Sequence, residues 1–186
     1  AMKWYRMAAG QGHAGAQCNL GVMYKEGQGV AQDYSAAMKW YRMAADQGDA
    51  NAQCNIGFMY KKGQGVALDY SAAMKWYRMA VDQGHAQAQC NLGVMYKHGQ
   101  GVAQDDSAAM KCFSRAAEQG HPYAKYFIGK IYLKQEKFSD ALRMFNDAKN
   151  NGCKESEDKI NEIFKIKKEI KLNEKKWKEY KDKYIH

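Results

Sequence analysis

Close internal repetition is the feature that most constrains the fold of this chain. The block AQCNLGVMY at positions 16–24 returns as AQCNIGFMY at 52–60 and unchanged at 88–96, with a weaker copy, AKYFIGKIY, further on. Self-similarity at a fixed period of 36 residues is typical of repeat architectures, in which small units stack on one another to bury a shared core. A second block, AMKWYRMAA, recurs with the same period at 1–9, 37–45, 73–81 and, more loosely, 109–117.

Each repeat predicts two helices joined by a glycine-rich loop. Leu20, Met23 and Tyr24 recur at helical spacing and predict one buried stripe on the first helix. Gly27 is expected to end that helix in the left-handed conformation, and Asp33 is expected to cap the N-terminus of the second. Since a single helix pair cannot bury its apolar faces, we expect an all-α fold, an α-solenoid of stacked antiparallel helix pairs.

One glycine inside each first helix predicts close packing. Gly21 costs about 1 kcal/mol relative to alanine at a helix interior, yet it recurs as Gly57, Gly93 and Gly129. We therefore expect the partner helix to approach closely at this point, with the bulky ring of Tyr41 filling the space that a side chain would occupy.

The combined pattern resembles Sel1-like repeats, a tetratricopeptide-related family, over residues 1–152. The resemblance implies a non-catalytic scaffold or adaptor that assembles other proteins, in signalling, quality control or bacterial interaction with hosts. The residues that carry it in one repeat are Leu20, Gly21, Tyr24, Gly27, Gly29, Val30, Asp33, Ala37, Tyr41, Ala44, Ala45 and Gly48.

The repeats predict a solenoid over 1–152 and a separate Lys-rich helix over 153–186. The last repeat lacks the Gly-x-Gly-Val loop and is closer to a plain tetratricopeptide unit, so a tighter turn is expected at 133–140. The solenoid is expected to contain the second helix of a truncated repeat at 1–12 and repeats at about 13–48, 49–84, 85–120 and 121–152.

The C-terminal helix has two interpretations. It could cap the exposed core of the last repeat, or it could bind a partner or a second copy of the chain as a dimer. Its apolar positions alternate in steps of three and four, which is typical of a coiled-coil seam. The candidate interface residues are Ile163, Ile166, Ile170, Trp177, Tyr180 and Tyr184.

A partner-binding surface is expected on the concave face. In tetratricopeptide solenoids the first helices line that face, and transferring this register to the present chain gives three ladders of equivalent positions. A ladder of asparagines could bond to a peptide backbone, and nearby lysines would favour an acidic partner. Alternatively, the asparagines satisfy their own neighbours and the lysines match the helix dipoles. The candidate residues are Asn19, Asn55, Asn91, Val22, Phe58, Val94, Lys25, Lys61, Lys97, Tyr126, Phe127 and Lys130.

The charge balance leaves a second function open. Lys and Arg number 29 against 20 acidic residues, a net charge of +9, which could support nucleic-acid binding through the Lys-rich surface and the C-terminal helix. Acidic residues are interspersed in that helix, which argues against this alternative. No apolar run approaches the length of a membrane span.

The cysteines and histidines predict no metal or cofactor site. The five cysteines form no C-x-x-C pair and have no histidine at ligand spacing, and free thiols favour a reducing cytoplasm, with a secreted effector left open. Four of them are expected to be small packing residues, whereas Cys153 is the candidate for an exposed thiol. His13, His85 and His121 are expected in inter-repeat turns or caps, with Asp49 as their equivalent. No catalytic constellation is apparent, so no enzyme is expected.

Overall fold

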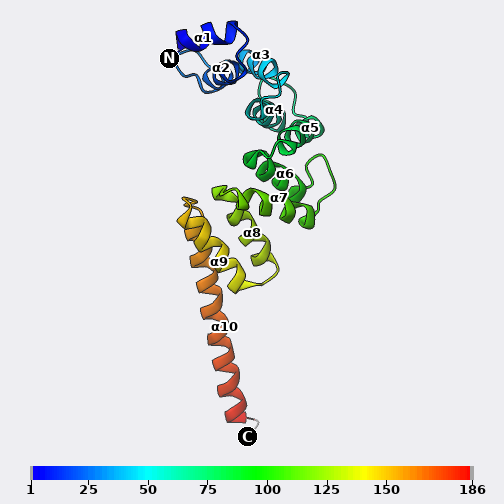
Figure 1. Cartoon of the computed structure of the whole chain (residues 1–186). Coiled ribbons are helices and arrows are strands. Elements are labelled where there is room, and N and C mark those ends of the chain that lie inside the picture. Colours follow the sequence, from blue (N-terminus) through cyan, green and yellow to red (C-terminus); the bar gives the residue numbers. More distant parts are fainter. Residues whose placement is uncertain (1, 185–186) are drawn as a thin grey trace. The chain divides into compact units, whose positions relative to one another are not determined.

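The computed structural model describes the backbone of residues 2–184 and the side chains of residues 3–176, 178 and 179. Within these residues the chain forms ten α-helices and no strand (Figure 1). The chain divides into two compact units, residues 1–121 and 122–186. The predicted fold class, an all-α solenoid of helix pairs with a long C-terminal helix, is confirmed.

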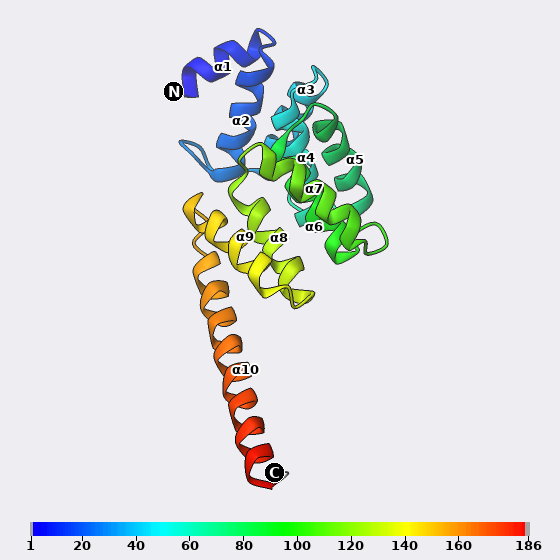
Figure 2. The same cartoon turned by 60° about the horizontal axis from the view of Figure 1, so that its bottom comes forward.

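The first unit is a stack of helix pairs, which Figure 2 shows from a second direction. Helices α2 and α3, α4 and α5, and α6 and α7 form antiparallel pairs, and α3 packs on α4 just as α5 packs on α6. Helices α3 and α5 are thereby each held between two first helices. The bounds are α1 (Met2–Gly10), α2 (Ala14–Glu26), α3 (Tyr34–Ala45), α4 (Ala50–Lys62), α5 (Tyr70–Asp82), α6 (Ala86–His98) and α7 (Asp106–Glu118).

The recurring interior glycines make the predicted close contact. A Cβ atom placed on Gly21 would lie 2.5 Å from Cδ1 of Tyr41, and one on Gly57 would lie 2.8 Å from Cδ1 of Tyr77. Both tyrosine rings are completely buried. The energetic cost of glycine inside these helices is therefore offset by ring packing directly against the backbone of the paired helix.

The predicted caps are also confirmed. Gly27 has φ 70° and its N–H donates to the carbonyl oxygen of Met23, which ends α2 in the left-handed conformation. Asp33 Oδ1 accepts from Ala36 N at 2.9 Å and so caps α3. The same carboxylate cap recurs at the start of α5 and α7, on Asp69 and Asp105.

Buried glutamines connect the two helices of each repeat, a feature that the sequence analysis missed. Gln17, Gln53 and Gln89 are buried at equivalent positions of α2, α4 and α6. Each accepts a hydrogen bond from the glutamine that ends the paired second helix 30 residues later, as Gln47 Nε2 does with Gln17 Oε1 at 2.7 Å. Because each buried amide has a partner, these bonds hold the two helices of a pair together without leaving the glutamine unpaired.

The second unit holds α8 (Pro122–Lys134), α9 (Phe138–Asn150) and α10 (Ser156–Tyr184). The turn between α8 and α9 is short, as the missing glycine loop predicts. Ile160 and Ile163 at the start of α10 are buried with Phe145 of α9, so this part of α10 covers the core of the last helix pair. No helix in the described part of the chain is long and apolar enough to span a membrane.

The expectation that Cys153 is an exposed thiol is wrong. Cys153 lies in the turn between α9 and α10, and its exposed fraction is 0%. Its backbone N–H donates to the carbonyl oxygen of Ala148 in α9. Cys153 is buried because the apolar first turns of α10 fold back onto α9 and extend the core beyond the last repeat.

Candidate functional site

The predicted ladders of the first unit lie on the first helices α2, α4 and α6. We call the surface formed there by the asparagines and the apolar and basic positions that follow them the asparagine face. Asn19 is exposed, whereas Asn55 and Asn91 are half-buried. Its remaining positions, Val22, Phe58, Val94, Lys25, Lys61 and Lys97, are all half-buried.

Thiols of one repeat orient the asparagines of the next. Asn91 Nδ2 donates to Sγ of Cys54 at 3.9 Å, and the Asn55 side chain, one repeat earlier, acts on Cys18 in the same sense by opposing the rise of its pKa. Burial raises the pKa of both thiols to about 12, so they stay protonated and neutral at ordinary pH. Sequence reasoning missed this pairing, although the constant 37-residue offset between cysteine and asparagine is visible in the repeats.

Basic side chains lie further along the same helices. Lys25 Nζ lies 3.0 Å from a carboxylate oxygen of Glu26 and 5.1 Å from the ring centroid of Phe58, in cation–π distance. Burial, and then the neighbouring charge of Lys62, lowers the pKa of Lys61. An anion bound beside Lys61 would therefore relieve an unfavourable concentration of positive charge.

The remaining predicted residues of the ladders belong to α8 in the second unit. The rings of Tyr126 and Phe127 meet edge to face at a centroid distance of 5.6 Å, and Tyr126 also contacts Phe145 of α9. Lys130 Nζ lies 5.6 Å from the Tyr126 ring centroid. In α8 the asparagine ladder is thus replaced by a packed aromatic cluster.

The predicted seam of α10 divides along its length. Ile163 is completely buried in the core of the second unit, Ile166 is half-buried and Ile170 is 42% exposed. The side chains of Trp177, Tyr180 and Tyr184 lie outside the described residues.

The N-cap of α6 is joined to α4 by a polar bond. His85 Nδ1 accepts from the N–H of Ala88 at 3.2 Å, so Nε2 carries the proton and donates to Asn51 Oδ1 at 3.0 Å. Burial lowers the pKa of His85, which favours this neutral form. One repeat later, His121 Nε2 lies 2.9 Å from Gln87 Oε1, which repeats the contact between the ring and a side-chain amide.

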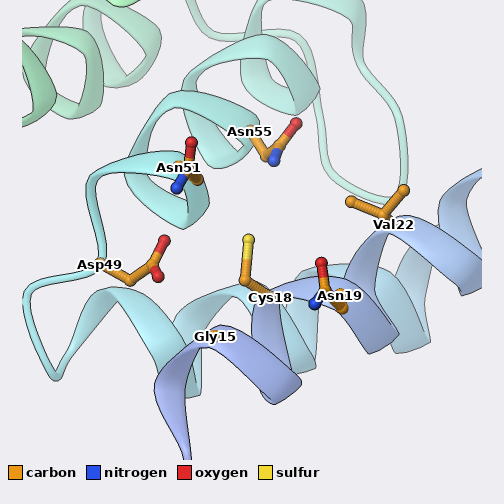
Figure 3. Close-up of a pocket in the computed structure, with 7 residues that line it drawn as sticks. All are labelled: Gly15, Cys18, Asn19, Val22, Asp49, Asn51 and Asn55. Carbon is orange, nitrogen blue, oxygen red and sulfur yellow. The ribbon is translucent and has the colours of Figure 1, made fainter. Parts of the chain in front are cut away.

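A pocket of about 410 Å³ opens between α2 and α4, at one end of the asparagine face (Figure 3). Burial, followed by the charge of Asp49 and a hydrogen bond to it, raises the pKa of the Cys18 thiol, which lines the pocket. Asp49 also caps α4, since its Oδ1 accepts from Ala52 N at 2.7 Å. The lining residues are Gly15, Cys18, Asn19, Val22, Asp49, Asn51 and Asn55.

The described residues contain no cluster of three or more His, Cys, Asp or Glu side chains that could hold a metal ion. The five cysteines are all free thiols. The asparagine face and the pocket present amides, lysines, the Asp49 carboxylate, the Cys18 thiol and the apolar side chains of Val22, Phe58 and Val94.

Comparison with known proteins identifies the repeat. A sequence model of the Sel1 repeat matches well over half of the chain. The chain belongs to the Sel1 repeat family. Sel1 repeats generally serve as protein–protein interaction modules, and Sel1 repeat proteins are typically non-catalytic scaffolds. The matched segments are residues 1–13, 14–49, 50–85 and 86–121.

Several solved structures are similar to this Sel1 repeat chain. A Sel1 repeat protein from Oxalobacter formigenes is 33% identical with a TM-score of 0.82, covering 89% of this chain and 67% of its own. The protective antigen c5321 of uropathogenic Escherichia coli is also 33% identical, with a TM-score of 0.74. The match covers 88% of this chain but only 36% of the antigen. The immunity protein Pa5087 from Pseudomonas aeruginosa shares the fold, with a TM-score of 0.62 at 23% identity. The match covers 83% of this chain and 59% of that protein. No curated protein matches the sequence.

Proposed function

We propose that the chain is a non-catalytic scaffold whose asparagine face binds an extended peptide or protein segment. The observation that carries this proposal is the pair of half-buried amides of Asn55 and Asn91, each oriented by a thiol of the preceding repeat. A side-chain amide both donates and accepts, which matches the alternating N–H and C=O groups of an extended main chain.

The charge of the asparagine face favours an acidic segment. The half-buried Lys61 lies beside Lys62, and the whole chain carries a net charge of +9. Carboxylates of a partner would pair with these lysines and would also accelerate association at low ionic strength.

The start of α10 supports the capping interpretation of the C-terminal helix, because Ile160 and Ile163 complete the core beside α9. We include in the proposal the division into a solenoid over 1–152 and a C-terminal helix over 153–186, with the part of α10 from Ile166 onward available to a partner. One similar structure is described as a protective antigen of a bacterium. We therefore include in the proposal that this chain takes part in contact between a bacterium and its host.

The test is a selection of binding peptides from a random library on the immobilised chain, followed by fluorescence anisotropy. The double variant Asn55→Ala with Asn91→Ala should bind the selected peptides about thirtyfold more weakly, because two amide hydrogen bonds of about 1 kcal/mol each are lost. A matched control replaces two exposed asparagines of α9, Asn146→Ala with Asn150→Ala, and should leave affinity unchanged.

The helical circular dichroism of both double variants should equal that of the parent chain. Equal weakening by both variants, or undiminished binding by the asparagine-face variant, would place the binding surface elsewhere.

A further inference from the structure

The pocket between α2 and α4 exists because one inter-repeat bond is missing there. At the next interface Asn51 Oδ1 and His85 Nε2 join α4 to α6. The equivalent positions one repeat earlier hold Gly15 and Asp49. A Cβ atom on Gly15 would meet nothing within 4 Å, so this wall of the interface stays open.

The pocket is also acidic, through Asp49, whereas the rest of the asparagine face carries lysines. Burial raises the pKa of Cys18, Cys54 and Cys90; the charge of Asp49 adds to the rise at Cys18, whereas Lys25 and Lys61 oppose it at Cys54 and Cys90. Among the lining residues Asp49 carries the one formal charge. A cationic group is therefore favoured in this pocket.

Next to the carboxylate the pocket presents hydrogen-bond donors. The carbonyl oxygen of Asn51 is engaged by His85, which leaves its NH₂ group to donate, and Asn55 uses its NH₂ group toward the Cys18 thiol with a second N–H remaining. Figure 3 shows both asparagines on the wall opposite Cys18. The site thus offers an anionic acceptor and amide donors side by side.

We propose that this pocket binds the free amino terminus of a peptide, with the ammonium on Asp49 and the first carbonyl oxygen on the amides of Asn51 and Asn55. The proposal rests on the proposed function, because it names which part of the bound segment occupies this end of the asparagine face. Val22 and Cys18 would contact the first side chain, which favours a small apolar residue.

Other ligands fit these groups less well. A lysine side chain brings an ammonium but no carbonyl oxygen beside it. A guanidinium prefers both oxygens of a carboxylate, and Oδ1 of Asp49 already accepts from Ala52 N. An anion at the N-terminus of α4 would meet the carboxylate that caps it.

The experiment is an NMR titration of the ¹⁵N-labelled full chain with tri-alanine amide carrying a free amino terminus. Addition should shift the side-chain amide signals of Asn51 and Asn55, and N-acetylation of the same peptide should abolish the shifts. The variant Gly15→Asn with Asp49→His, which copies the bonded pair of the next interface, should weaken binding about tenfold or more.

Two single variants separate charge from folding. Asp49→Asn keeps a good N-cap residue and removes the charge, so it should weaken binding, whereas Asp69→Asn makes the same change at the cap of α5 and should not. Equal binding of the acetylated peptide, undiminished binding by the pocket variants, or equally tight binding of acetyl-Ala-Lys-Ala amide would each overturn the assignment.

Tri-alanine amide, as a short probe, also separates this inference from the proposed function. Asn91 lies outside the pocket, so Asn91→Ala should weaken the long selected peptides without affecting tri-alanine amide. If selected peptides bind with the same affinity before and after N-acetylation, the terminal assignment fails while the asparagine face stands. If no selected peptide responds to Asn91→Ala but tri-alanine amide binds, the proposal for the asparagine face fails while the terminal assignment stands.

Discussion

Substituting alanine for Gly57 sets two physical effects against each other. Alanine is favoured over glycine by about 1 kcal/mol at a helix interior. Its Cβ, however, would lie 2.8 Å from both Cδ1 and Cε1 of Tyr77, whose ring is completely buried. Overpacking of this kind costs about 1–3 kcal/mol. Because the ring cannot retreat into solvent, we expect the clash to dominate and Gly57→Ala to lower the free energy of unfolding by up to about 2 kcal/mol.

The chain provides its own control for this prediction. Gly15 also lies in a first helix, but an added Cβ would have nothing within 4 Å, so Gly15→Ala should raise stability by up to about 1 kcal/mol. Urea unfolding followed by circular dichroism at 222 nm measures both, and the denaturant slope should stay unchanged. A double-mutant cycle with Tyr77→Leu should recover much of the loss. If Gly57→Ala were as stabilising as Gly15→Ala, the close-packing argument would be refuted.

Three further predictions concern single side chains. The hydroxyl of Tyr77 is buried without a hydrogen-bond partner, so Tyr77→Phe should keep or raise stability in urea unfolding, and a loss above about 1 kcal/mol would contradict this. Burial lowers the pKa of His85 below 6.5, so its stabilising contribution should be complete above pH 6.5 and be lost as the pH falls through the lowered pKa. The difference in stability between the parent chain and His85→Asn, measured from pH 4.5 to 7.5, should show this trend. A pH-independent difference would disprove it. With its pKa raised to about 12, Cys54 should react with iodoacetamide far more slowly at pH 8 than an unfolded cysteine, and equal rates would contradict its burial.

The repeated contacts are the part of the structure that sequence reasoning could predict. The Gly21–Tyr41 packing, the Asp33 cap and the left-handed Gly27 all follow from residues that recur at one period, and each involves neighbouring elements of the same helix pair. Periodicity supplies several independent observations of one local geometry, which makes such inferences strong.

What escaped prediction depends on buried polar contacts, on differences between the copies and on packing of distant segments. The bond from Gln47 to Gln17 joins a turn to a buried position of the paired helix, and apolar patterning does not reveal a buried amide. The pocket arises from a difference between copies, Gly15 and Asp49 in place of a bonded pair, so comparison of the repeats could have found it. The burial of Cys153 depends on the packing of α10 against α9, which the local sequence around position 153 does not reveal.

The central claim is that the surface of α2, α4 and α6 holding the asparagines is where a partner segment binds. Hydrogen exchange measured by mass spectrometry, with and without a saturating selected peptide, tests it on the full chain. The account predicts slowed exchange in peptides from these three helices, with α3 and α5 unchanged. Protection confined to α3, α5 or α10 would contradict it.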